Sequence, residues 1–293
     1  MQGKRELSSM KDKRIEWIDV AKAIGIIIVL AYHACPDGYF KNMMWQMHMP
    51  LFAFLSGIVY KEEYSLNFQK VRIFIVKKIE KLYIPFEAYS LFFLLLHNFF
   101  YKINFIGEIN GNKILSGGGY VKQFVLILTL GGGESLTGAL WYLIPLFELE
   151  IIFTVLLCLF KQIKKDKECN CVVAVIVAFI YILFSNLNLP RNLSNASRLI
   201  LFYSAGYFCK KYNVLELKRS VPKQVAALVG CLAIWMGCTL YSESWQGKNL
   251  LITAVSAGAA IYCVVEISKF LTKVARNKWL RYLNISERKQ CPL

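Results

Sequence analysis

The sequence has 293 residues, of which 56% are hydrophobic and 18% are charged, and its formal net charge is +16. A soluble chain of this length carries about a quarter charged residues, so this composition argues against a soluble domain. Long apolar runs separated by short basic links instead predict a polytopic membrane protein. The positive charge is then explained by membrane topology, and no nucleic-acid partner is expected.

Eight apolar segments predict membrane-spanning helices. We expect residues 1–293 to form a single membrane-embedded domain, an all-α transmembrane bundle, with 1–17 as a cytoplasmic lead-in and 282–293 as an atypical polar tail. A ninth apolar segment, 120–130, is too short to cross and predicts a re-entrant or interfacial piece. The predicted spans are Ile18–Ala34, Met43–Tyr60, Leu82–Tyr101, Ala139–Phe160, Cys171–Ser185, Ser197–Cys209, Pro222–Tyr241 and Leu250–Ile267.

The first apolar segment follows a basic leader, as in a secretory signal peptide. However, Asp19 and Lys22 interrupt the start of its apolar core, and another apolar segment follows closely. We therefore expect 18–34 to be retained as the first span.

Lysine and arginine are unevenly distributed among the links between spans. If residue 1 is cytoplasmic, the inner segments hold 25 of the 35 Lys and Arg residues, and the outer segments hold seven. Positive charge is retained on the cytoplasmic side of a membrane. This distribution predicts a multi-pass protein of the cell membrane, surrounded by lipids, with a cytoplasmic N-terminus.

The first span carries a cation near its inner end and an imidazole near its outer end. Lys22 and His33 are eleven residues apart. Eleven residues make three helical turns plus about 20°, so both side chains lie on one face, roughly 16 Å apart along the axis. We expect this face to be turned into the bundle. Ionisable groups inside a bilayer are costly and are functional candidates by default. The alternative for Lys22 is an ion pair with Asp19 at the membrane boundary.

The other two histidines also lie in apolar segments. His48 opens the second span on the same outer side as His33. Two histidines near one cavity suit a general base and an orienting group, although a structural role fits His48 equally well. His97 has no such companions, and we expect it to be structural.

A second basic group precedes the third span. Lys78 and Lys81 are one turn apart, and together with Lys22 they predict a cationic mouth suited to phosphates. Positive charge on the inner side explains them as well. Three acidic residues at or within spans are candidates for pairing with these lysines, namely Glu87, Glu148 and Glu150.

Several chemical motifs are missing from the sequence. There is no G-x-x-x-x-G-K, G-x-S-x-G or H-E-x-x-H, which argues against a P-loop NTPase, a serine hydrolase of that type or a zincin. Cys169 and Cys171 have no second pair or histidine at zinc spacing, so no metal site is expected.

The motifs, in their order, resemble those of the acyltransferase family 3 integral membrane proteins, particularly the fucose 4-O-acetylase-like acetyltransferase branch. That family opens with W-[IL]-D-x-[AL]-[RK]-[AG] and has ten residues between its basic residue and a histidine, as Lys22 and His33 do. Its F-H-M-P-L-F-F-F-L-S-G is matched by M-H-M-P-L-F-A-F-L-S-G at Met47–Gly57. Its R-R-x-x-R-L-x-x-P and L-W-F-L elements are matched at 77–85 and 140–143.

The resemblance implies transfer of an acyl group, usually acetyl, from cytoplasmic acetyl-CoA to a sugar hydroxyl. The acceptor is a surface polysaccharide or a lipid-linked glycan. His33 matches the essential histidine of the family, Lys22 matches its basic partner, and Asp19 lies one turn before Lys22. Candidate residues for binding the donor or the acceptor are Lys78, Lys81, His48, Trp141 and Glu150.

Three departures from the family pattern accompany the resemblance. Lysines replace arginines, which keeps the charge but loses bidentate phosphate contacts. We count eight spans where the family has about ten, and 282–293 turn polar where another span is expected, which predicts a shortened C-terminus. The alternatives are an inactive remnant and a transporter or flippase of a glycan or small anion. A transporter would call for internal inverted repeats, which the sequence does not show.

Overall fold

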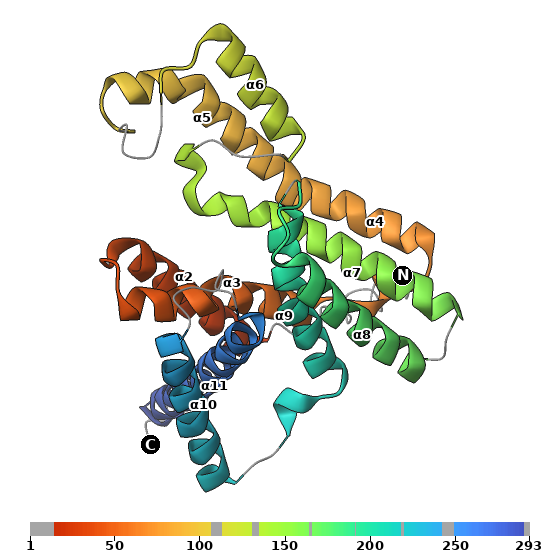
Figure 1. The fold of residues 1–293 in the computed structure, drawn as a ribbon. Helices are drawn as coiled ribbons and strands as arrows, with labels where there is room; N and C mark the ends of the chain where they lie inside the picture. The colour runs from red at the N-terminus through yellow and green to blue at the C-terminus, as the bar shows by residue number, and fades with distance from the viewer. Residues whose placement is uncertain are drawn as a thin grey trace, which may run out of the picture. The chain divides into compact units, whose positions relative to one another are not determined.

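The computed structural model describes residues 15–106, 113–130, 135–163, 166–190, 192–217, 220–241 and 249–289, without the side chains of 135, 139 and 277–289. Throughout these residues the regular structure is helical, which confirms the predicted all-α class (Figure 1). Two of the eight predicted spans begin in a short element before the main helix, Leu82–Tyr101 in the π-helix η2 (Ile79–Tyr83) and Ala139–Phe160 in the 3₁₀ helix η4 (Ser135–Tyr142). Each predicted span otherwise lies mainly on one helix. These helices are α2 Glu16–Ala34, α3 Tyr39–Val59, α5 Ile84–Lys102, α7 Leu143–Ile163, α8 Asp166–Phe184, α9 Leu193–Lys211, α10 Val221–Tyr241 and α11 Leu250–Lys289.

Several predicted boundaries differ from the structure, most of all at the last span. The last predicted span ends at Ile267, whereas α11 continues to Lys289. Lysine and arginine are good helix formers, so a helix continues readily beyond its apolar part. The short segment predicted at 120–130 is the helix α6, Gly117–Leu128. The remaining elements are α4 Phe68–Lys78, η1 Glu62–Ser65, the π-helix η2 Ile79–Tyr83, η4 Ser135–Tyr142 and η5 Val214–Glu216.

Among the described residues, five helices are long and apolar enough to cross a membrane, and the predicted spans on α3, α5 and α9 are not among them. Large apolar side chains project outward from several helices. The five candidates are Glu16–Ala34, Leu140–Ile163, Asp166–Phe184, Val221–Tyr241 and Leu250–Arg276. Leu95 on α5 is 76% exposed and Leu30 on α2 is 64% exposed. Outward apolar side chains of this kind are expected where lipid replaces water as the solvent. The protein is therefore a multi-pass membrane protein.

The chain divides into two compact units, and the division falls within α3. The first unit comprises 1–55 and 218–293, and the second comprises 56–217. Each unit is described below by itself.

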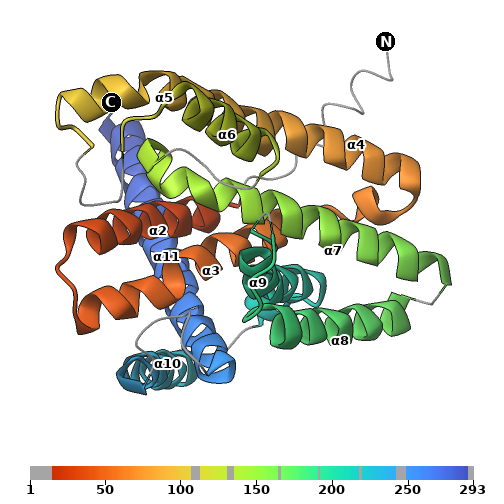
Figure 2. The same ribbon diagram turned by 45° about the horizontal axis from the view of Figure 1, so that its top comes forward.

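The first unit contains α2, most of α3, α10 and α11 (Figure 2). A Cβ atom at Gly25 would lie 2.9 Å from the ring of Phe52, so a small residue lets α2 approach α3 closely. Gln46 of α3 joins three helices, because its side-chain oxygen accepts hydrogen bonds from Thr239 of α10 and Ser256 of α11. These contacts fix the register of α3 within the unit.

The second unit contains α4 to α9. In Figure 2, α4 and α5 follow one another along one line, with η2 between them. Tyr60, just after α3, is surrounded by aromatic rings from α7 and α9, with centroids 5.9 Å from Phe153, 6.2 Å from Tyr203 and 5.8 Å from Tyr207. Edge-to-face pairs of this kind stabilise a core beyond the area they bury.

Gly57 brings the end of α3 against the backbone of α9. A Cβ atom at this position would lie 1.9 Å from the carbonyl oxygen of Tyr203. No side chain fits there, because the obstacle is backbone that cannot rotate away. This close approach explains the glycine in the L-S-G sequence of the second span.

We expect Gly57→Ala to lower the stability of the protein by about 1–3 kcal/mol through overpacking. The measurement is the midpoint of thermal unfolding in detergent. Gly258→Ala is the matched control, since a Cβ atom at Gly258 of α11 meets nothing within 4 Å. That control should be neutral or stabilising by up to about 1 kcal/mol. Equal effects of the two changes would contradict the packing argument.

Candidate active site

Helix α2 carries the cation and the imidazole singled out by the sequence. It is uninterrupted from Glu16 to Ala34, so the predicted alignment of Lys22 and His33 on one face holds. The buried residues of the helix form a stripe of Ile18, Ala21 and Gly25. Lys22 and His33 lie at the edge of this stripe, and both side chains are exposed. Asp19 is half-buried one turn before Lys22.

His33 belongs to a cluster of rings from the end of α2 and the start of α3. The ring of Tyr32 lies 5.0 Å from His33, edge-on, and is stacked at 5.1 Å on His48. Trp45 lies 5.0 Å from Tyr32 and 5.3 Å from His48. The structure therefore brings both predicted outer-side histidines to one cluster, joined by a tyrosine and a tryptophan that the sequence analysis missed.

The two buried polar atoms of this cluster have no hydrogen-bond partner among the described residues. His48 is 1% exposed, and its Nδ1 lies 3.0 Å from the carbonyl oxygen of Met44. A carbonyl only accepts, so Nδ1 carries the proton and Nε2 of the neutral ring keeps its lone pair. Nε2 of His48 and the Nε1–H of Trp45 are the two unpartnered atoms. An unpaired buried group costs about 1–3 kcal/mol and calls for an explanation.

Helix α10 holds the start of α3 in place beside this cluster. Nε1–H of Trp235 donates to the carbonyl of Met43 at 3.2 Å, and the hydroxyl of Tyr39 donates to the carbonyl of Met236 at 2.7 Å. Lys41, in the first turn of α3, places its Nζ 5.4 Å from the centre of the Tyr32 ring. These contacts come from residues far apart in sequence, so they fix the cluster through tertiary structure.

The second unit holds the lysines that precede the third span. Lys78 forms an ion pair with Glu150 at 2.6 Å, and the two side chains are 23% and 3% exposed. The pairing alternative for Glu150 is therefore confirmed. Lys81, in contrast, is exposed.

Lys81 lies within a π-helix that begins directly after Lys78. Pro85 has no N–H to give to the carbonyl of residue 81, and its ring would clash with that carbonyl in a regular helix. The chain adopts the wider turn of η2 at Ile79–Tyr83. Lys78 and Lys81 consequently have different surroundings, although an ideal α-helix would place them about 60° apart. Their shared role in binding phosphates stays a prediction.

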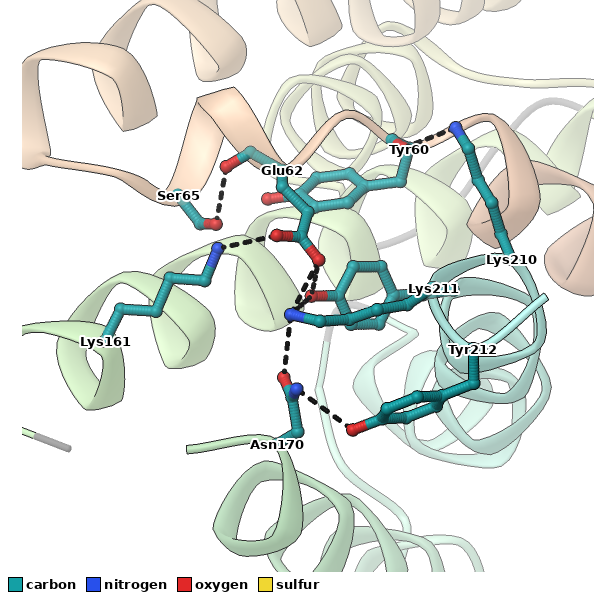
Figure 3. A network of polar contacts seen from close by, with 9 residues as sticks. Tyr60, Glu62, Ser65, Lys161, Asn170, Lys210, Lys211 and Tyr212 are labelled. Carbon is teal, nitrogen blue, oxygen red and sulfur yellow. Dashed lines mark hydrogen bonds and ion pairs between the residues drawn. The ribbon is translucent and has the colours of Figure 1, made fainter. Parts of the chain in front are cut away.

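A polar network centred on Glu62 ties together neighbouring ends of α7, α8 and α9 (Figure 3). The Glu62 carboxylate accepts from the hydroxyl of Tyr207 at 2.6 Å and pairs with Lys211 at 2.8 Å and Lys161 at 3.3 Å. Lys211 also donates to Asn170 of α8. The sequence analysis missed this network. Its only signal was an acidic pair, Glu62 and Glu63, inside a basic link.

The charge of Glu62 is well stabilised by its neighbours. Burial raises its pKa, but the hydrogen bonds from Lys211 and Tyr207 and the charge of Lys161 outweigh burial and lower the pKa to about 2. The contribution of the network to folding stability therefore depends on the Glu62 carboxylate being ionised.

Two other predicted residues have clear positions. Nε2–H of His97 donates to the carbonyl of Lys113 at 2.9 Å, and Asn98 exchanges hydrogen bonds with the backbone of Leu115. His97 thus has the structural role expected of it. Trp141 is half-exposed in η4, edge-on to Tyr142 at 6.3 Å. Across the described residues, no group of three or more His, Cys, Asp or Glu side chains is arranged to hold a metal ion.

Comparison with known proteins identifies the family. A family model described as an acyltransferase domain matches residues 15–284. The chain belongs to this acyltransferase family. The match includes the Lys22–His33 helix, the aromatic cluster and both compact units. No curated protein and no solved structure matched the chain. The protein is therefore a membrane acyltransferase.

Removing Lys78 from its pair with Glu150 should be strongly destabilising. We expect Lys78→Ala to cost about 3 kcal/mol, because the Glu150 charge is left buried without a partner. The thermal unfolding midpoint measures the loss. The double change Lys78→Met/Glu150→Leu should recover most of it, and Lys81→Ala, at an exposed position, should be nearly neutral. A Lys78→Ala protein as stable as the Lys81→Ala control would show that the pair contributes little.

Glu62 predicts a pH dependence of stability. Its folded-state pKa of about 2 lies below the ordinary value of 4.5, so its contribution is complete above pH 4.5 and is lost as the pH falls towards 2. Since Glu62 is 39% exposed, screening reduces that contribution to about 1–2 kcal/mol.

The measurement compares thermal midpoints between pH 7 and pH 3. Glu62→Gln should lower the midpoint at pH 7 and should converge with the original protein in acid. Glu63→Gln, at the exposed neighbouring residue, is the matched control and should follow the original protein throughout. Parallel curves for Glu62→Gln and the original protein would contradict the assignment.

Proposed function

We propose that the protein is an O-acetyltransferase of the cell membrane that moves an acetyl group from cytoplasmic acetyl-CoA to a hydroxyl of a surface polysaccharide or lipid-linked glycan. One observation carries the proposal: the family match includes an unbroken helix on which Lys22 and His33 share an exposed face. The fucose 4-O-acetylase-like motifs support acetyl as the acyl group and a sugar as the acceptor. The uneven distribution of lysine and arginine supports a cytoplasmic N-terminus.

His33 is the proposed general base. It takes the proton from the acceptor hydroxyl while the hydroxyl oxygen attacks the thioester carbonyl. The new C–O bond forms, the C–S bond breaks, and the proton passes from the imidazole to the departing CoA thiolate. An imidazole suits this role because its pKa is near neutral, and general-base catalysis contributes about 10²–10⁴ in rate.

Lysines are the proposed partners of the donor phosphates. Lys22 and Lys81 are both exposed. Lys78, which pairs with Glu150 at 2.6 Å, is a further candidate in the second unit. Each ammonium is a point charge, so these contacts lack the fixed geometry of an arginine–phosphate pair.

His33→Ala should abolish acetyl transfer while the protein remains inserted and folded. The assay uses the protein in lipid nanodiscs with acetyl-CoA and p-nitrophenyl hexopyranosides, and it follows the release of free CoA thiol. Lys81→Glu should raise the KM for acetyl-CoA about tenfold, because an attractive charge becomes repulsive. Lys102→Glu is the control at an exposed position on the predicted outer side, and it should leave this KM unchanged.

Full activity of His33→Ala would reject His33 as the base. In cells, deletion of the gene should remove O-acetyl groups from surface glycans. If glycans instead moved across sealed vesicles without any acetyl donor, the transporter would replace the enzyme as the explanation.

A further inference from the structure

The ring cluster at the start of α3 contains a hydrogen-bond donor and an acceptor that nothing in the described chain satisfies. The donor is Nε1–H of Trp45 and the acceptor is Nε2 of His48. Their rings lie 5.3 Å apart. The remaining nitrogen of His48 is occupied by the Met44 carbonyl, which fixes the tautomer and keeps the Nε2 lone pair available.

An unsatisfied donor and an unsatisfied acceptor on neighbouring rings match the two needs of one hydroxyl group. A hydroxyl accepts from an indole N–H and donates to an imidazole nitrogen at the same time. A carboxylate or phosphate lacks the proton that His48 requires, and an ammonium lacks the lone pair that Trp45 requires. The pair therefore favours an alcohol over an ion.

The surroundings of the pair favour a sugar among alcohols. Tyr32 stacks on His48 at 5.1 Å between ring centres and lies 5.0 Å from Trp45, so its ring is in contact with both rings. Tyr32 is half-buried in the last turn of α2. Aromatic rings beside a hydroxyl-binding pair suit a pyranose, which has apolar C–H faces and hydroxyls at its rim.

We propose that Trp45 and His48 form a subsite for a hydroxyl of the acceptor sugar, with Tyr32 as its aromatic cover. This inference rests on the proposed function, and it adds a specificity determinant to it. All three residues belong to the first compact unit, as does His33.

The hydroxyl in this subsite is not the one that is acetylated. A hydroxyl has one proton, and a hydroxyl that donates it to His48 has none left for His33. The Tyr32 ring is in contact with both imidazoles, with ring centres 5.0 Å from His33 and 5.1 Å from His48, and we propose that the two histidines bind different hydroxyls of the same sugar. The subsite therefore selects acceptors that carry a second hydroxyl close to the reacting one.

The test measures CoA release in nanodiscs with p-nitrophenyl hexopyranosides and their monodeoxy analogues. Trp45→Phe keeps the ring and removes only the N–H. We expect the KM for the glycoside to rise about tenfold, which corresponds to the loss of one hydrogen bond, with the KM for acetyl-CoA unchanged. The original protein should discriminate against one monodeoxy analogue, and Trp45→Phe should lose that discrimination.

Trp235→Phe is the matched control. Its indole N–H already donates to Met43, so this change should lower thermal stability without changing the preference between the hydroxy and deoxy acceptors. An unchanged acceptor KM in Trp45→Phe would overturn the proposal, and so would an equal rise for both substrates. A change confined to thermal stability would show that only a structural water completes the pair, and would overturn it as well.

A binding measurement separates this proposal from the proposed function. With the indole nitrogens isotopically labelled, the Trp45 signal is identified by its loss in Trp45→Phe. We expect titration with the p-nitrophenyl hexopyranoside to shift the Trp45 signal and to leave the Trp235 signal in place. A shift without CoA release would support the subsite and reject the transferase. CoA release without a shift of the Trp45 signal would support the transferase and reject the subsite.

Discussion

The structure depends on one constraint, namely that polar groups on apolar helices must find partners on other helices. The interior of such a bundle offers little water for hydrogen bonding, so an unpaired polar or charged group there lowers the stability of the fold. Gln46 of α3 meets this constraint in the first unit by accepting from Thr239 and Ser256. Glu150 and Glu62 meet it in the second unit with lysine partners. These few contacts determine which helices are neighbours and in which register.

The same constraint separates structural polar groups from candidates for function. Glu62 has three donors around its carboxylate, and its role is structural, because it links η1, α7 and α9. His48 and Trp45 lie side by side, and one atom of each is left without a partner in the described residues. A donor and an acceptor left open together, next to the histidine that the family motif identifies, are better explained by an external hydroxyl than by packing.

The replacement of arginine by lysine in the basic element is easier to understand from its surroundings. Lys78 lies between the Phe74 ring, 5.2 Å from its centre, and the Glu150 carboxylate. A single ammonium satisfies one carboxylate there without the five donors that a guanidinium would bring into a largely buried position. The charge on which the family motif depends is kept, and its geometry is relaxed.

Much of the candidate site was accessible from the sequence because helix geometry is regular. The spacing of Lys22 and His33 fixed their common face, and the apolar runs located the helices that carry the other candidates. The pairing of Lys78 with Glu150 was only one of two alternatives, since positions 72 residues apart leave no periodic signal. The π-helix was not predicted either, because the conflict between Pro85 and the carbonyl four residues earlier is resolved only when the chain is built.

The sequence by itself determined the helices, their apolar faces, the membrane setting and the motif histidine, all of which follow from local periodicity and composition. Tertiary structure alone decided that Tyr32, Trp45, His33 and His48 share one cluster, that Gly57 touches the backbone of Tyr203, and that Glu62 gathers two lysines and a tyrosine. Contacts between helices depend on packing angle and register, which are set by many side chains at once. No single stretch of sequence contains that information.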